Sequence, residues 1–131
     1  MNIGAVSKLT GLSSKSIRLY EDKGLITAPL RSESGYREYS QQHVQQLNLI
    51  SRAKNAGFSL LECKEFVHLA SNPNRKSSEV KAKAKEKLKE IEIKIRELKE
   101  IEKQLKQWVT ACPGDSSSDC PIIEDLIKKE S

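Results

Sequence analysis

Residues 13–39 read SSKSIRLYEDKGLITAPLRSESGYREY, and a helical pattern in the first part of this stretch changes to a strand-like pattern in the second. The first part has serine caps and the apolar spacing of a short helix, with Ile17 and Tyr20 one turn apart. The second part has short strand-like runs on either side of Ser34 and Gly35, which is typical of a tight β-hairpin. A helix followed directly by a hairpin predicts a winged arrangement.

The elements around this stretch are predicted to be helices. Residues 3–9 have apolar side chains at helical spacing and end at Gly11, so the first two helices form a helix-turn-helix. Ser40 and Ser59 each precede a further helical pattern and are potential N-caps. These elements predict a mainly α-helical domain over residues 1–70, with the hairpin as its wing.

The charge of this predicted domain indicates a polyanionic partner. Residues 1–75 carry ten Lys and Arg against six Asp and Glu, and the whole chain has a net charge of +5. On the second helix Lys15 and Arg18 share a face away from the apolar side chains. A basic face of this kind suits phosphates, because each phosphate that it neutralises releases condensed counterions.

Residues 77–109 have a different pattern, typical of a coiled coil. The apolar residues recur every three or four positions with a mean spacing of 3.5 residues. They are Val80, Ala84, Leu88, Ile91, Ile95, Leu98, Ile101, Leu105 and Trp108. Lys and Glu fill nearly all other positions, so we expect this helix to pair with its copy in a homodimer. The alternative is a solvated charged helix that remains single.

Residues 110–131 are predicted to form a loop and a short terminal helix. A Pro-Gly pair after Cys112 suits a type II turn, and Pro121 suits the first position of a helix, so the loop can fold back and bring Cys112 and Cys120 together. Cys120 would then lie at the helix N-terminus, where peptide dipoles favour the thiolate form. The apolar side chains expected to cover the sulfurs are Ile122, Ile123, Leu126 and Ile127.

Two thiolates without a neighbouring His or third Cys suit a soft monovalent ion, whereas structural zinc normally takes four ligands. We therefore expect one Cu(I), or alternatively Ag(I) or Au(I), for each loop with Cys112 and Cys120. Asp115 and Asp119 are better explained as turn and cap residues than as ligands of a harder ion. The pattern leaves open a disulfide redox switch, or two cysteines without any site.

The remaining cysteine and histidines, and the overall composition, exclude other classes. Cys63 is expected to be a buried small side chain, and His43 and His68 stand alone. The isolated histidines and scattered acidic residues do not provide a nucleophile paired with a base, so we do not expect an enzyme. No apolar run approaches the roughly 20 residues needed to span a bilayer, and no signal peptide is evident. We expect a cytoplasmic protein without a membrane partner.

Three stretches resemble the MerR transcription regulators, namely residues 3–11, 16–26 and 31–39. The sequences CPGD at 112–115 and DCPIIE at 119–124 are similar to the copper-efflux regulators of that family. The resemblance implies a homodimer joined by antiparallel long helices, which binds double-stranded promoter DNA with its second helix in a major groove and its wing on the backbone. It also implies that the metal-bound form distorts the promoter so that RNA polymerase can use it.

The resemblance also implies roles for single residues. Arg18 and Tyr20 match helix positions that meet DNA, Tyr36 and Arg37 match wing contacts, and Lys15 and Arg31 are expected to bind phosphate. Ser77 stands where relatives that sense divalent ions carry a cysteine, which favours a monovalent ion here. Lys54 stands where the family often has Arg, and a lysine gives up the bidentate geometry of a guanidinium.

Two other functions compete with a metal-responsive regulator. The iron-sulfur relatives of the family sense redox state, but they use four cysteines in the loop, whereas this loop has two. A coiled-coil adaptor that never touches DNA would explain residues 77–108 but leave the hairpin and Arg18 without a role. The resemblance therefore favours a DNA-binding regulator.

Overall fold

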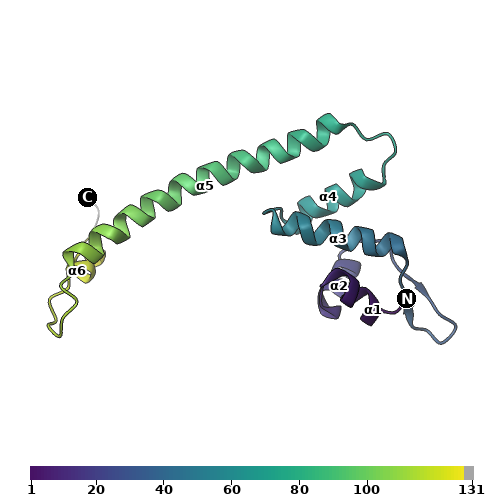
Figure 1. The fold of residues 1–131 in the computed structure, drawn as a ribbon, viewed down its shortest axis with the longest axis horizontal. Coiled ribbons are helices and arrows are strands. Elements are labelled where there is room, and N and C mark those ends of the chain that lie inside the picture. The colour runs from purple at the N-terminus through teal and green to yellow at the C-terminus, as the bar shows by residue number, and fades with distance from the viewer. Residues whose placement is uncertain (129–131) are drawn as a thin grey trace. The chain divides into compact units, whose positions relative to one another are not determined.

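The structure is a computed structural model, and it describes residues 1–128 (Figure 1). The described elements are α1 (Ile3–Thr10), α2 (Ser14–Asp22), β1 (Leu30–Arg31), β2 (Arg37–Glu38), α3 (Gln41–Asn55), α4 (Leu60–Ser71), α5 (Ser77–Ala111) and α6 (Pro121–Ile127). This order confirms the predicted mainly helical fold, with its hairpin and long helix. Residues 129–131, the end of the predicted terminal segment, lie outside the described residues.

Two compact units are present, and each is described by itself. The first unit runs from Met1 to Lys87 and contains α1 to α4, the hairpin and the first turns of α5. The second unit begins at Leu88 and contains the rest of α5, the cysteine loop and α6. None of the helices in residues 1–128 has the length and apolar character needed to cross a membrane.

Short polar side chains begin the helices as the sequence predicts. The Ser13 hydroxyl accepts a hydrogen bond from the Ser16 amide at 3.1 Å at the start of α2. At α4, the Glu62 amide donates to the Ser59 hydroxyl at 3.2 Å, and the Ser59 amide donates to the Glu62 carboxylate at 2.8 Å. Such a reciprocal pair satisfies two amides that the helix leaves unpaired. Ser77 is the first residue of α5.

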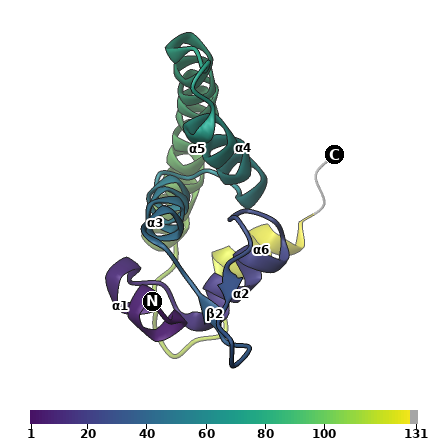
Figure 2. The ribbon, with the colours of Figure 1, turned by 90° about the vertical axis from the view of Figure 1, so that its right-hand side faces the viewer.

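The hairpin projects from the helices between α2 and α3 (Figures 1 and 2). Its strands are antiparallel, with Leu30 opposite Glu38 and Arg31 opposite Arg37. At the tip the Gly35 amide donates to the Ser32 carbonyl at 2.9 Å, and Gly35 has a φ of +84°. That left-handed backbone is the reason for a glycine here, and it confirms the predicted tip.

The core lies entirely in the first unit. Its buried hydrophobic side chains are Val6, Ile17, Tyr20, Leu25, Ile26, Tyr39, Val44, Leu47, Ile50, Cys63 and Val67. They come from the first four helices and from the segments on both sides of the hairpin. This packing fixes α2 and the base of the wing on one support.

His43 is buried at the start of α3 and uses both ring nitrogens within the first unit. Its Nδ1 accepts from the Ser40 amide at 2.9 Å, so its Nε2 carries the proton and donates to the Thr27 carbonyl, also at 2.9 Å. The Tyr39 ring packs edge-on against it at 5.5 Å between centroids. His43 is therefore a structural residue, as expected from its isolation in the sequence.

Shortening a core side chain should destabilise the first unit. Leu47 is fully buried, so Leu47→Ala is expected to lower the free energy of unfolding by about 2–5 kcal/mol, through reduced burial and the remaining cavity. Leu61, on α4, is 71% exposed, and Leu61→Ala should change the same quantity by only about 0.5 kcal/mol or less. Urea unfolding followed by circular dichroism, at one protein concentration, compares the two. Equal losses would contradict this assignment of the core.

Candidate nucleic-acid interface and metal centre

Four of the six predicted DNA-binding residues line one surface hollow in the first unit. Arg18 comes from α2, Arg31 and Arg37 from the two strands, and Tyr36 from the hairpin. The hollow measures about 370 Å³ and is completed by Asn2, Ile3 and Gly35. Three guanidinium groups around one concave surface make a site for phosphate or another anion.

Arg31 and Arg37 are each held by a neighbour. Nη1 of Arg31 donates to the Gly35 carbonyl at 2.9 Å, which ties the side chain to the hairpin tip. Nε of Arg37 donates to both carboxylate oxygens of Glu21, at 3.1 and 3.0 Å. This hydrogen bond and the charge of Glu21 raise the pKa of Arg37. The wing is thereby attached to α2.

Two predicted contacts lie elsewhere. Tyr20 is only 4% exposed and belongs to the core, so its side chain supports α2 rather than facing outward with Arg18. Its helical spacing from Ile17 already indicated packing, and the structure places it accordingly. Lys15 is exposed on α2 but does not line the hollow. Lys54 lies with its Nζ 6.0 Å from the centre of the Tyr20 ring.

Sequence reasoning missed Glu21 as part of this face. An acidic residue at the end of a helix beside a basic surface looks like a solvated charge, and no periodicity links it to residues on a hairpin. In the structure its side chain is only 14% exposed and contacts both Arg37 and Tyr39. The available signal was its position one residue after Tyr20, at the end of α2 nearest the hairpin.

The second unit brings the two loop cysteines together. The Sγ atoms of Cys112 and Cys120 are 4.0 Å apart, and both side chains are half-buried. Gly114 has a φ of +65°, as the predicted turn after Cys112 requires. The Asp115 carboxylate accepts from the Ser117 amide at 2.9 Å, which lowers the pKa of Asp115. Asp115 therefore acts as a turn residue.

The distance between the two sulfurs and the number of nearby ligands determine which ions this pair can bind. A disulfide needs sulfurs about 2.05 Å apart, so these thiols are free. With metal–sulfur distances of about 2.3 Å, one ion between two sulfurs separates them by about 3.8 Å at a tetrahedral angle and about 4.6 Å in a straight line. The observed 4.0 Å falls within that range. Across residues 1–128, no group of three or more His, Cys, Asp or Glu could hold a metal ion, so the pair fits an ion with two protein ligands.

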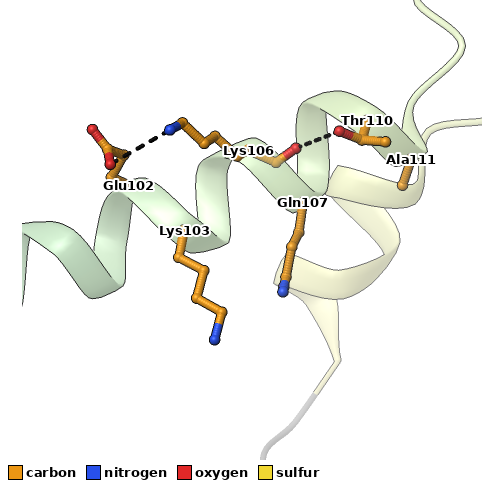
Figure 3. A pocket seen from close by; sticks show the side chains of 6 residues that line it. All are labelled: Glu102, Lys103, Lys106, Gln107, Thr110 and Ala111. Atoms are coloured by element: carbon orange, nitrogen blue, oxygen red, sulfur yellow. Dashed lines mark hydrogen bonds and ion pairs between the residues drawn. The ribbon is translucent and has the colours of Figure 1, made fainter.

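A hydrogen bond positions Cys120 beside the end of α5. The indole N–H of Trp108 donates to the Asp125 carboxylate at 2.6 Å, which joins α5 to α6. Figure 3 shows α6 folded back next to the last turns of α5. This contact was absent from the sequence prediction, which treated Trp108 only as a member of the apolar repeat.

The predicted apolar cover over the sulfurs is wrong for the single chain. Of the four apolar residues of α6, Ile123, Leu126 and Ile127 are exposed, and only Ile122 is half-buried. The helix has seven residues and is joined to α5 by the hydrogen bond from Trp108 to Asp125, and most of its apolar side is exposed.

The surface of α5 carries further exposed apolar side chains. They are Leu88, Ile91, Ile93, Ile95, Leu98, Ile101, Leu105 and Val109. A hollow nearby on the same helix, drawn in Figure 3, is lined by polar and charged side chains and by Ala111, and it contains the Lys106 to Glu102 ion pair at 3.6 Å. It presents no thiol or imidazole, so the sulfur pair remains the chemical centre of this unit.

The third cysteine takes no part in that centre. Cys63 is fully buried on α4, in the first unit, and its Sγ lies 3.8 Å from the Ile50 carbonyl. Burial raises the pKa of this thiol, so it stays protonated at neutral pH. Cys63 is therefore a small buried side chain, as the sequence predicts.

Comparison with known proteins shows the family. A model described as MerR HTH family regulatory protein matches residues 1–69, and one described as MerR, DNA binding, matches residues 44–108. The HTH-type transcriptional regulator CueR of Vibrio cholerae is 60% identical over 126 residues, covering 96% of this chain and 91% of the relative. The chain belongs to the MerR family.

Solved MerR-family structures share the fold. A transcription regulator from Ralstonia metallidurans in complex with lead(II) is 29% identical, with a TM-score of 0.85 over 96% of this chain and 98% of that one. The regulator MerR from Bacillus megaterium in complex with mercury(II) is 33% identical, with a TM-score of 0.72 over 94% and 95%. These MerR relatives are transcription regulators, which confirms the prediction of a regulator rather than an enzyme.

Removing the indole donor should loosen α6. Trp108→Phe keeps an aromatic ring but has no N–H for Asp125, so the amides of residues 121–127 are expected to exchange hydrogen several-fold faster. Hydrogen-exchange mass spectrometry measures the difference. Val109→Ala, at the exposed neighbouring position, is the matched control and should leave these amides unchanged. Unaltered exchange in Trp108→Phe would show that other contacts hold α6.

Proposed function

We propose that this MerR-family chain is a homodimeric regulator that binds promoter DNA and responds to Cu(I), with Ag(I) and Au(I) as alternative inducers. The observation that carries the metal proposal is the pair of sulfurs 4.0 Å apart, with no third ligating side chain grouped with them in residues 1–128. Cys112 and Cys120 would hold one ion per chain. The reducing cytoplasm, where we locate the protein, keeps both thiols free.

The donor set favours a soft monovalent ion over a divalent one. Two thiolates and one monovalent cation leave a single negative charge, whereas zinc, which normally takes four ligands, is under-coordinated with two. The lead(II) and mercury(II) complexes of the relatives support a metal as the signal in this family. Ser77, with a hydroxyl where we expect divalent sensors to carry a thiol, supports the monovalent choice. The loop motif resembles those of copper-efflux regulators.

The DNA-binding role is assigned to residues 1–70. Arg18 from α2 and Tyr36, Arg31 and Arg37 from the wing would bind DNA together, since they line one hollow. Lys15 is a further phosphate partner at the exposed face of α2. We propose that Tyr20 contributes to DNA binding through the packing of α2, because its side chain is buried.

Residues 77–109 are assigned to dimerisation and residues 110–131 to metal binding. Six of the exposed apolar side chains of α5, namely Leu88, Ile91, Ile95, Leu98, Ile101 and Leu105, belong to the coiled-coil repeat, and burial against an antiparallel copy would remove them from water. A bound ion supplies a bridge between the two loop sulfurs. We propose that ion binding orders this loop, and that the paired α5 helices transmit the change to the DNA-binding units. The promoter DNA is then bent and untwisted, which lets RNA polymerase use it.

Metal specificity can be tested by anaerobic titration of the reduced protein with Cu(I) and with Zn(II). We expect one tightly bound Cu(I) per chain and much weaker Zn(II) binding, because zinc lacks two further ligands. Cys112→Ser should abolish Cu(I) binding and copper-dependent promoter output. Cys63→Ala, the control at the buried thiol, should retain one Cu(I) per chain. X-ray absorption showing four nitrogen or sulfur donors around copper would contradict the proposal.

DNA recognition can be tested separately through the hollow. Arg18→Ala is expected to weaken binding of a promoter duplex about tenfold and to leave metal stoichiometry intact, because the two sites lie in different units. Fluorescence anisotropy at several salt concentrations gives the DNA affinity. It also gives the salt slope, which is the slope of the logarithm of affinity against the logarithm of salt concentration. Lys106→Ala removes an exposed cation on α5 and serves as the charge control. Loss of metal binding in Arg18→Ala would indicate a folding defect instead.

A further inference from the structure

The positive charges of the arginines in the hollow repel one another when no DNA is bound. Arg31 and Arg37 lie directly opposite each other across β1 and β2, and Arg18 lines the same hollow. Like charges in directly opposed strand positions are destabilising. Glu21 supplies a negative charge next to Arg37, with a side chain that is only 14% exposed.

The geometry of the Glu21 contact leaves the outer part of Arg37 available. Only Nε of Arg37 donates to Glu21, although it reaches both carboxylate oxygens, at 3.1 and 3.0 Å. Within residues 1–128 the two terminal nitrogens of Arg37 have no protein acceptor. A guanidinium fixed through its inner nitrogen can direct these two donors together at one phosphate. The Arg37 side chain is 30% exposed and lines the hollow.

The carboxylate is itself fixed from the core. The Tyr39 hydroxyl donates to Oε2 of Glu21 at 3.2 Å, and the Tyr39 ring is buried against His43. Burial and the charge of Glu21 raise the pKa of Tyr39, so its hydroxyl remains a donor at neutral pH. A chain of contacts thus runs from the core through Tyr39 and Glu21 to the wing.

We propose that Glu21 is a positioning residue for DNA binding, which holds Arg37 so that its terminal nitrogens meet a backbone phosphate. The assignment rests on the proposed DNA-binding face, and it goes beyond that face because Glu21 itself is acidic. On charge alone, a carboxylate beside DNA weakens binding. As a positioning residue, it strengthens binding. The two roles therefore predict opposite changes in DNA affinity when the Glu21 carboxylate is removed. Binding becomes tighter if only the charge matters, and weaker if Glu21 positions Arg37.

The test measures affinity for a labelled duplex that the wild-type protein selects from a random-sequence pool. Glu21→Gln removes the charge and the strong acceptor, and we expect binding about tenfold weaker, by fluorescence anisotropy. The salt slope should also fall, by about 0.9 for each phosphate that the protein no longer neutralises. Glu38→Gln removes an exposed carboxylate from the same strand as Arg37, and it should bind equally or more tightly. Binding by Glu21→Gln as tight as wild type, with the same slope, overturns the proposal.

A double-mutant cycle separates this proposal from the wider DNA-binding assignment. In an Arg37→Ala background, Glu21 has no Arg37 side chain to position, so Glu21→Gln should no longer weaken DNA binding. If Arg37→Ala alone leaves affinity unchanged, the proposed DNA-binding face fails together with the role of Glu21. If Arg37→Ala weakens binding but Glu21→Gln does not, only the positioning role fails.

A milder variant keeps the proposal testable if Glu21→Gln does not fold. Tyr39→Phe retains the buried ring and removes only the hydroxyl that holds Glu21. We expect binding a few-fold weaker, with thermal unfolding close to that of the wild type. Wild-type affinity in a folded Tyr39→Phe, together with an unfolded Glu21→Gln, would make Glu21 a stability residue and overturn the proposal.

Discussion

A small core between Val6 and Val67 supports the whole first unit, and every buried side chain in residues 1–128 lies within that span. Helices α1 to α4 close this core, and it holds α2 through Ile17 and Tyr20. Helix α5 contributes no buried residue and exposes a line of apolar side chains. The two halves of the chain therefore obtain stability differently: the first by its own packing, and the second, as we propose, by pairing.

The wing depends on polar contacts more than on packing. Each strand has two residues, and neither is fully buried. The base of the hairpin is fixed by Tyr39, whose backbone exchanges two hydrogen bonds of 2.8 Å with Met1 and whose hydroxyl reaches Glu21. A hairpin this short is marginal alone. Its orientation is consequently set by ionic and hydrogen-bonding partners, which a nearby polyanion can also engage.

The sulfur pair is built almost entirely from local chain geometry. Cys112 and Cys120 are eight residues apart, and the turns at Gly114 and Asp115 close the loop between them. One longer contact, from Trp108 to Asp125, sets where α6 lies beside α5. A site of this kind can adjust its loop on binding an ion without involving the core, which belongs to the other unit, and this suits the sensing role proposed for it.

Elements with local causes can be predicted from the sequence: serine caps, the hairpin tip at Gly35, the 3.5-residue repeat, and a loop able to join two thiols. Three features follow only from the three-dimensional packing: Tyr20 packs inward, Glu21 holds Arg37, and α6 leaves its apolar side exposed. Caps, turns and repeats act over a few residues and leave a pattern in the sequence. The contact between Glu21 and Arg37 joins side chains sixteen residues apart, and only the packing of α2 against the hairpin determines that they meet.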